Sequence, residues 1–189
     1  MKNLERGRNV LRHISALLVI TLAFGVAADE TDFGPVSSLK VDLEKVVELG
    51  TVSPVDGITS AGQPDEAALE VFADAGYATV IDLRGEGEDR GFDEAAVVEE
   101  LGLHYVTLPI ANGGEITFDN ARRLDELLQE YPGPVLVHCA SGNRVGALLA
   151  LRASLGGADD ERALSLGREG GLTSLEGAVQ ERLAGDDKP

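Results

Sequence analysis

Short apolar segments alternate with amphipathic segments along most of this chain, and this alternation limits the folds that it can adopt. The apolar segments, which have the length of buried strands, are residues 77–83, 103–110 and 135–137. The segments with helical spacing are residues 64–75, 93–101, 117–130, 145–155, 159–168 and 174–183. Strands that alternate with helices predict an α/β domain, in which helices flank a central and mostly parallel sheet.

Residues that favour helix ends support this alternation. Pro64 suits a first helical turn because that turn has no use for its missing donor, and Asp65 suits the positive end of the helix dipole. Gly76 then ends the same helix. Residues 38–49 could form one more amphipathic helix, ending at Gly50.

Residues 1–28 have the features of a secretory signal peptide. A basic start precedes the apolar segment Ile14–Ala28, and small residues close that segment just before Asp29. The segment is shorter than the ~20 residues that a membrane-spanning helix needs. We therefore predict export to a periplasm or to the outside medium; the alternative is an uncleaved N-terminal anchor. Residues 29–50 then form a leader with a helix, and residues 51–189 form one folded domain.

The charge balance excludes two classes of partner. The chain has 33 acidic and 16 basic residues, a net charge of -17, and removal of the basic segment 1–28 makes it more negative. Nucleic acids bind to clustered Lys and Arg, so no nucleic acid is expected as a partner. The same charge repels anionic lipids, so no membrane partner is expected after cleavage. One cysteine is too few for an internal disulfide or a multi-cysteine zinc site.

The segment His138–Arg144 combines groups that favour anion binding and nucleophilic catalysis. It lies between an apolar strand and a helix, where successive backbone N–H groups can surround an anion. The helix dipole and Arg144 would favour the thiolate form of Cys139, and Arg144 can bind an oxyanion through two hydrogen bonds. His138 could orient the loop. The residues predicted to bind the substrate are Ala140, Ser141, Gly142, Asn143 and Arg144. The expected partner is a small molecule with an oxyanionic group, and neither a metal nor a cofactor is expected.

Three motifs in this order resemble a known family. They are Ser-Ala-Gly-Gln-Pro at 60–64, Val-Ile-Asp-Leu-Arg at 80–84 and His-Cys-x-x-Gly-x-Arg at 138–144. The last resembles the signature loop of the dual-specificity and tyrosine phosphatase superfamily. Together they resemble the phosphatase-like domain of beta-lactamase-hydrolase-like proteins, over about Ile58 to Leu155. The resemblance implies a cysteine-phosphatase fold and a hydrolase in which Cys139 is the nucleophile and Arg144 binds the oxyanion.

Three departures from that pattern keep other functions open. Four residues separate Cys139 from Arg144 where ordinary cysteine phosphatases have five, and this shorter length is typical of rhodanese-like sulfurtransferases. Val145 stands where the phosphatases usually have a serine or threonine that helps the sulfur leave. The loop expected to supply a general acid, residues 111–115, has Glu115 as its only carboxylate.

These observations leave one leading hypothesis and two alternatives. The leading hypothesis is an exported hydrolase that cleaves phosphomonoesters through a phospho-intermediate on Cys139. The first alternative is a sulfurtransferase that takes sulfur from a sulfane donor as a Cys139 persulfide. The second is a module that binds phosphate or sulfate without turnover.

Other polar residues are expected to have structural roles. Asp82 and Arg84 could form an ion pair or cap a turn at the end of a strand. The acidic residues between Arg84 and Gly91 are expected to form a solvated, mobile loop that could close over the site. His104 is expected to be an ordinary strand residue.

Overall fold

The computed structural model describes residues 38–54, 57–185 and 188. Internal contacts separate Met1–Glu30 from Thr31–Pro189, and every described residue lies in the second unit. The predicted signal peptide lies outside the described residues, so export stays a prediction. None of the helices among the described residues is long and apolar enough to cross a membrane.

Five strands form one sheet, and every pairing between them is parallel. The strands are β1 (Ser38–Lys40), β2 (Ile58–Ala61), β3 (Thr79–Asp82), β4 (His104–Thr107) and β5 (Val135–His138), in the spatial order β1-β2-β5-β3-β4. The central strand β5 therefore lies between β2 and β3, and its carboxyl end is surrounded by those of its neighbours. The predicted α/β class with a mostly parallel sheet is confirmed.

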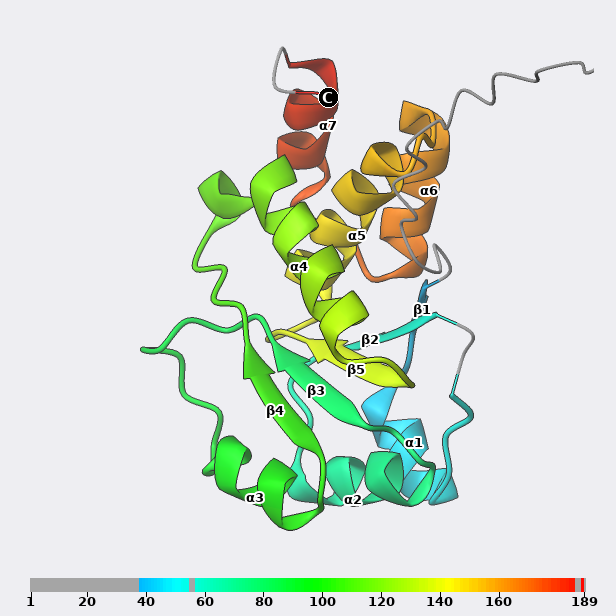
Figure 1. Ribbon diagram of the computed structural model, residues 1–189, viewed down its shortest axis with the longest axis vertical. Helices are drawn as coiled ribbons and strands as arrows, with labels where there is room; N and C mark the ends of the chain where they lie inside the picture. The colour runs from blue at the N-terminus through cyan, green and yellow to red at the C-terminus, as the bar shows by residue number, and fades with distance from the viewer. Residues whose placement is uncertain (1–37, 55–56, 186–187, 189) are drawn as a thin grey trace, which may run out of the picture. The chain divides into compact units, whose positions relative to one another are not determined.

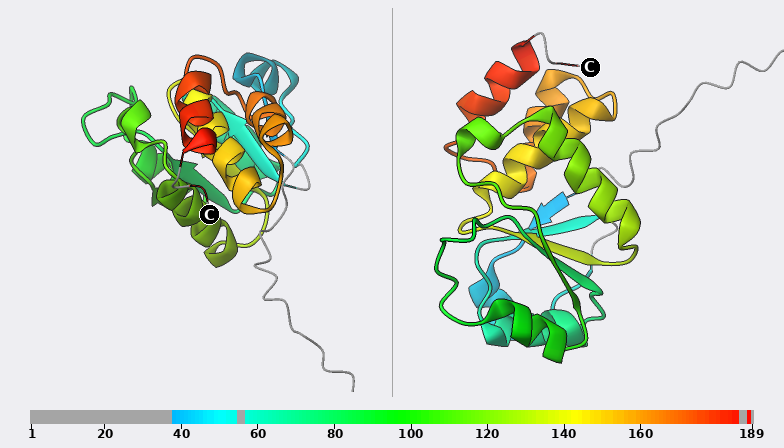
Figure 2. Two further views of the ribbon diagram at one scale, coloured as in Figure 1. Left: turned by 90° about the horizontal axis from the view of Figure 1, so that it is seen from above. Right: turned by 60° about the vertical axis from the view of Figure 1, so that its left-hand side comes forward.

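Helices cover both faces of the sheet (Figures 1 and 2). On one face lie α1 (Leu43–Leu49), α2 (Glu66–Asp74) and α3 (Glu94–Glu100), which enclose a core that includes Val46, Leu69, Phe72 and Val98. On the other lie α4 (Phe118–Glu130), α5 (Asn143–Leu155), α6 (Asp160–Glu169) and α7 (Glu176–Ala184), around a core that includes Ile81, Leu124, Leu148 and Leu151. A short 3₁₀ turn, η1 (Gly113–Glu115), precedes α4.

The central helix α5 is buried along most of its length, and two contacts fix it against its neighbours. A Cβ atom added at Gly146 would lie 2.1 Å from the backbone nitrogen of Leu172, so only glycine allows this close approach to the segment after α6. Arg152 of α5 donates from Nε to Asp125 Oδ1 of α4 at 2.7 Å, and both residues are buried. These contacts fix the helix whose first turn carries Arg144.

The first described segment differs from the prediction of one helix over residues 38–49. Ser38–Lys40 is an edge strand paired with β2, and only residues 43–49 are helical, with Asp42 as the N-cap. β1 and α1 both precede residue 51, where we placed the start of the phosphatase-like domain. β2 was also not predicted as a strand. Residues 38–40 and 58–61 are strands because they pair with neighbouring strands of the sheet, and not because of a local sequence pattern.

Candidate active site

The predicted anion-binding loop leaves the carboxyl end of the central strand and enters the most buried helix. β5 ends at His138, and α5 begins at Asn143 with Gly142 as its N-cap. Gly142 has a φ of 85°, a left-handed conformation that favours glycine, and it lets the chain turn sharply into the helix. No side chain caps α5, so the first N–H groups of this helix stay available to an anion.

Cys139 lies at the base of this loop with its thiol directed toward the backbone of the turn. The residue is 1% exposed, and the N–H of Gly142 donates to its Sγ atom at 3.2 Å. A backbone donor to sulfur favours the negatively charged thiolate, which is the nucleophilic form. The predicted nucleophile therefore lies at the start of α5, in contact with a backbone donor.

The carbonyl groups of the loop point outward, toward donors on neighbouring segments. The Ala140 carbonyl accepts from the N–H of Gln63 at 3.3 Å, and the Ser141 carbonyl accepts from Lys40 Nζ at 2.8 Å. Gly62 allows this approach, because a Cβ atom there would lie 3.2 Å from the Ala140 oxygen. Because the N–H of a trans peptide points opposite to its C=O, the N–H groups of Ser141 and Gly142 point away from these outer donors.

Arg144 is fixed by three hydrogen bonds from two of its nitrogens. Its Nη1 donates to Glu88 Oε1 at 2.5 Å and to the Ile110 carbonyl at 2.7 Å, and its Nη2 donates to Glu88 Oε2 at 2.8 Å. Hydrogen bonding to Glu88 and attraction to Cys139 raise the pKa of Arg144, although burial opposes this. Glu88 thus accepts from both Nη atoms of Arg144, and the guanidinium also interacts with the Cys139 thiol.

Glu88 is a site residue that the sequence did not reveal. Hydrogen bonding to Arg144 is the largest cause that lowers the pKa of Glu88 from its usual 4.5 to about 2, so it is ionised at neutral pH. The sequence predicts a solvated, mobile loop here. In the structure Arg84 Nε donates to Glu88 Oε2 at 3.2 Å, and Arg90 Nη1 donates to the Glu88 carbonyl at 2.9 Å. The loop is therefore held by its own arginines and carries a carboxylate to the site.

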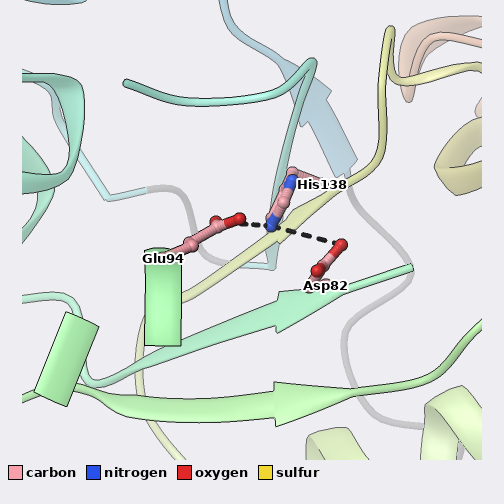
Figure 3. A group of neighbouring side chains, drawn as sticks. All are labelled: Asp82, Glu94 and His138. Atoms are coloured by element: carbon pink, nitrogen blue, oxygen red, sulfur yellow. Dashed lines mark ion pairs between the residues drawn. The ribbon is translucent and has the colours of Figure 1, made fainter. Parts of the chain in front are cut away.

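His138 points into a buried ionic cluster, where Figure 3 shows its Nε2 atom between the carboxylates of Asp82 and Glu94. Nε2 lies 2.9 Å from Glu94 Oε1 and 3.6 Å from Asp82 Oδ1, and all three side chains are fully buried. Arg90 Nε donates to the other oxygen of Asp82 at 2.6 Å, and Tyr105 donates its hydroxyl to the same oxygen at 2.8 Å. Arg84 donates its backbone N–H to Asp82 Oδ1 at 2.7 Å, so the predicted turn cap forms, whereas the ion pair of Asp82 is with Arg90.

This cluster also has the composition of a cation site, which the sequence did not predict. The ligand atoms of Asp82, Glu94 and His138 lie within 4.8 Å of one another and could share a small divalent ion. Arg90 already neutralises part of their charge, because its guanidinium lies 2.6 Å from Asp82. His138 contacts Asp82 and Glu94 in this cluster, and its role in orienting the loop stays a prediction.

Gln63 joins the three sequence motifs into one structure. Its Nε2 donates to Glu94 Oε2 at 2.9 Å, while its Oε1 accepts from Arg84 Nη1 at 2.5 Å. Its own N–H donates to the Ala140 carbonyl. The segments 60–64, 80–84 and 138–144 therefore contact one another at the carboxyl edge of the sheet.

The remaining predicted site residues have other contacts. Glu115 accepts a hydrogen bond from the N–H of Ala111 on the exposed rim of the loop after β4. The side chain of Asn143 accepts from the N–H of Thr173 at 2.8 Å, so its side chain is engaged outside the loop of residues 139–144. Val145 is fully buried in the core above the sheet. In the described part of the chain, Ala140 and Ser141 accept hydrogen bonds at their backbone carbonyls.

Comparison with known proteins agrees with this geometry. Residues 49–156 match the family described as beta-lactamase hydrolase-like protein, phosphatase-like domain. The chain belongs to this family. The matched residues therefore form a phosphatase-like domain.

The relatives differ widely in length. The beta-lactamase hydrolase-like protein of Agrobacterium fabrum is 31% identical over 104 residues, which cover 53% of this chain and 24% of that relative. The chain thus spans about a quarter of that curated relative. Among solved structures, a candidate phosphatase from Neisseria meningitidis has a TM-score of 0.59 at 21% identity, over 71% of this chain and 96% of the other. The core catalytic domain of a PP-IP phosphatase from S. cerevisiae has a TM-score of 0.52 at 15% identity, over 69% and 81%. Both share the cysteine-phosphatase fold.

Proposed function

We propose that this protein hydrolyses phosphomonoesters through a covalent phospho-intermediate on Cys139. The observation that carries the proposal is the joint placement of the Cys139 thiol, the loop amides and the Arg144 guanidinium around one position. The carbonyls of Ala140 and Ser141 accept from Gln63 and Lys40, and Glu88 orients Arg144 by accepting from both of its Nη atoms. A dianionic phosphate group beside Cys139 would therefore meet the N–H donors at the start of α5 and the positive charge of Arg144.

The reaction would proceed in two steps. The Cys139 thiolate attacks phosphorus, so that an S–P bond forms and the bond from phosphorus to the leaving oxygen breaks. Water then attacks the phosphocysteine, which releases inorganic phosphate and regenerates the thiolate. The N–H groups at the start of α5 and the Arg144 guanidinium would stabilise the charge on the equatorial oxygens in both steps.

Neither Glu88 nor Glu115 is placed to protonate a leaving oxygen, and this favours substrates with a good leaving group. Glu88 stays ionised because its pKa is about 2, so it cannot protonate a leaving oxygen at neutral pH. Glu115 is bound to the N–H of Ala111 and would have to turn toward the site to do so. A phenolate leaves without a proton far more readily than an alkoxide, so we propose aryl esters of the phosphotyrosine type as the preferred class.

The test uses purified wild-type protein and Cys139→Ser. Each is given an aryl phosphate, phosphotyrosine and phosphoserine, and phosphate release is measured. We expect release from the two aryl esters, little from phosphoserine, and none in the variant. Equal release by wild type and variant would contradict the proposal. Retained phosphate binding without any turnover would favour the non-catalytic module.

Sulfur transfer is the second candidate, and two observations favour it. The buried Val145 supplies no hydroxyl to assist a leaving sulfur, and no acid is needed when the leaving group is sulfite. In this reaction the Cys139 thiolate attacks the outer sulfur of thiosulfate, sulfite leaves, and cyanide removes the sulfur from the persulfide as thiocyanate. Thiocyanate that depends on Cys139, without phosphate release from any ester, would replace the first proposal with this one.

We also propose that the protein acts outside the cytoplasm, on the strength of the segment 1–28. The expected mature N-terminus is Asp29. Mass spectrometry of the protein recovered from a periplasmic or culture fraction tests this, and a cytoplasmic protein that keeps Met1 would contradict it.

A further inference from the structure

Lys40 lies on the edge strand β1, ahead of the family match, and reaches the anion-binding loop. It is one of four lysines in a chain with 33 acidic residues, and its Nζ donates to the Ser141 carbonyl at 2.8 Å. The two residues are 101 positions apart in the sequence. A rare positive charge is therefore placed against the outer side of the loop that holds the predicted nucleophile.

The peptide unit between Ser141 and Gly142 connects this lysine to the nucleophile. The carbonyl of that unit accepts from Lys40, and its N–H donates to Cys139 Sγ at 3.2 Å. The described chain has no cis peptide bond, so the C=O and N–H of this unit point in opposite directions. A charge that polarises the carbonyl makes the N–H of the same unit a stronger donor.

We infer that Lys40 is a positioning residue that activates Cys139 through the Ser141–Gly142 peptide. Its hydrogen bond orients that peptide, and its charge strengthens the donor that stabilises the thiolate. The inference rests on the proposed function only for its consequence, a faster attack on substrate. The effect on the thiol itself is independent of what the protein hydrolyses.

The space that the lysine occupies is kept free by glycines. A Cβ atom at Gly142 would lie 3.1 Å from Lys40 Cε, and a Cβ atom at Gly171 would lie 2.9 Å from Lys40 Cδ. The side chain of Lys40 thus passes between these two residues before its amine meets the loop. This path limits the rotamers that the Lys40 side chain can adopt, so its amine is held near the loop.

Two other charged groups act on Cys139 from the elements around it. Arg144 of α5 interacts with the thiol from the inner side of the loop, and Glu88 of the β3–α3 loop offsets part of the charge of Arg144. His138 contacts Asp82 and Glu94 below the loop. Arg144 must also bind the substrate, whereas Lys40 acts from outside and stays in place throughout the reaction.

The test measures the reactivity of the thiol without any substrate. The chain has one cysteine, so alkylation by iodoacetamide reports on Cys139 alone. Lys40→Met keeps the length of the aliphatic stem and removes the charge. Lys45→Met is the matched control, because Lys45 is a lysine of the same segment whose side chain is 73% exposed and pairs only with Asp42, at 3.9 Å.

We expect Lys40→Met to slow alkylation at neutral pH about two- to five-fold, the size expected for a unit charge acting across one peptide unit near solvent. The rate should stay at the wild-type value in Lys45→Met and return partly in Lys40→Arg, which can still donate to the carbonyl. Rescue by Lys40→Arg distinguishes an effect of the positive charge from a loss of side-chain packing.

Equal rates in the wild type and Lys40→Met, or an equal decrease in Lys45→Met, would overturn the inference. Thermal melting of each variant identifies a folding defect, and Lys40→Arg then carries the test. If the wild type releases no phosphate but Lys40→Met still slows alkylation, the proposed function fails and the inference stands. If phosphate is released and the alkylation rates are equal, the inference alone fails.

Discussion

Replacing Glu88 with glutamine removes the negative charge that holds the Arg144 guanidinium, with little change in side-chain shape. The fall in the pKa of Glu88 from 4.5 to about 2 corresponds to at most about 3 kcal/mol of favourable interaction. The Glu88 side chain is 30% exposed, and solvent screening reduces this to about 1–2 kcal/mol. If that energy keeps Arg144 aligned in the transition state, kcat/KM falls about 5- to 30-fold.

The assay compares wild type, Glu88→Gln and Glu86→Gln on an aryl phosphate, together with inhibition by inorganic phosphate. Glu86 is an exposed acid of the same loop, so its variant controls for the general loss of one negative charge. We expect Glu88→Gln alone to lower kcat/KM and weaken phosphate inhibition. Tighter phosphate inhibition in Glu88→Gln would refute the reasoning, because it would mean that the carboxylate competes for the anion position.

The same pair predicts a pH dependence of stability. Glu88 has a lower pKa in the folded state than in the unfolded state, so its contribution is complete above pH 4.5 and decreases as the pH falls toward 2. The difference in unfolding free energy between wild type and Glu88→Gln should therefore be about 1–2 kcal/mol at pH 7 and should shrink below pH 4.5. A difference that grows as the pH falls would contradict this assignment.

Three further predictions concern the scaffold and the charge of the chain. Gly146→Ala should destabilise the protein by about 3 kcal/mol or more in denaturant unfolding, because its Cβ would lie 2.1 Å from the Leu172 nitrogen; wild-type stability would disprove this close approach. Asp125→Ala should cost about 1–3 kcal/mol in the same assay, because it removes the buried carboxylate that accepts from Arg152 and Gln129, and unchanged stability would contradict that role. The KM for an anionic substrate should fall about two- to three-fold between 20 and 200 mM salt, because salt screens the repulsion from a net charge of -17. A KM that rises with salt would show that local attraction dominates.

Local patterns were sufficient for most of the helices and for the strands in the middle of the sheet. The predicted helical segment 117–130 contains α4, with Thr117 as its N-cap, and the apolar run before His138 is the central strand. The three residues of β1 were missed because so short a segment has no period of its own. Its strand character comes from pairing with β2, and pairing depends on residues that lie far apart in the sequence.

The loop that carries the chemistry could be predicted, but its supporting residues could not. Cys139 and Arg144 can be recognised in the sequence by their spacing and by the predicted strand and helix that flank them. Glu88 and Lys40 carry no such signal, because a lone acid in a glycine-rich loop and a lone lysine near a helix both resemble solvated residues. Only the folded chain brings them to the loop, across 56 residues from Glu88 to Arg144 and 101 from Lys40 to Ser141.

The edge position of β1 has a practical consequence for dissecting this protein. A fragment that starts at residue 49, where the family match begins, would lack the strand that pairs with β2. All four residues of β2 are buried, so its unpaired backbone would become an open edge beside apolar side chains. Such edges are templates for intermolecular pairing and aggregation. An expression fragment should therefore begin before Ser38, and a fragment cut at the family boundary should precipitate or self-associate.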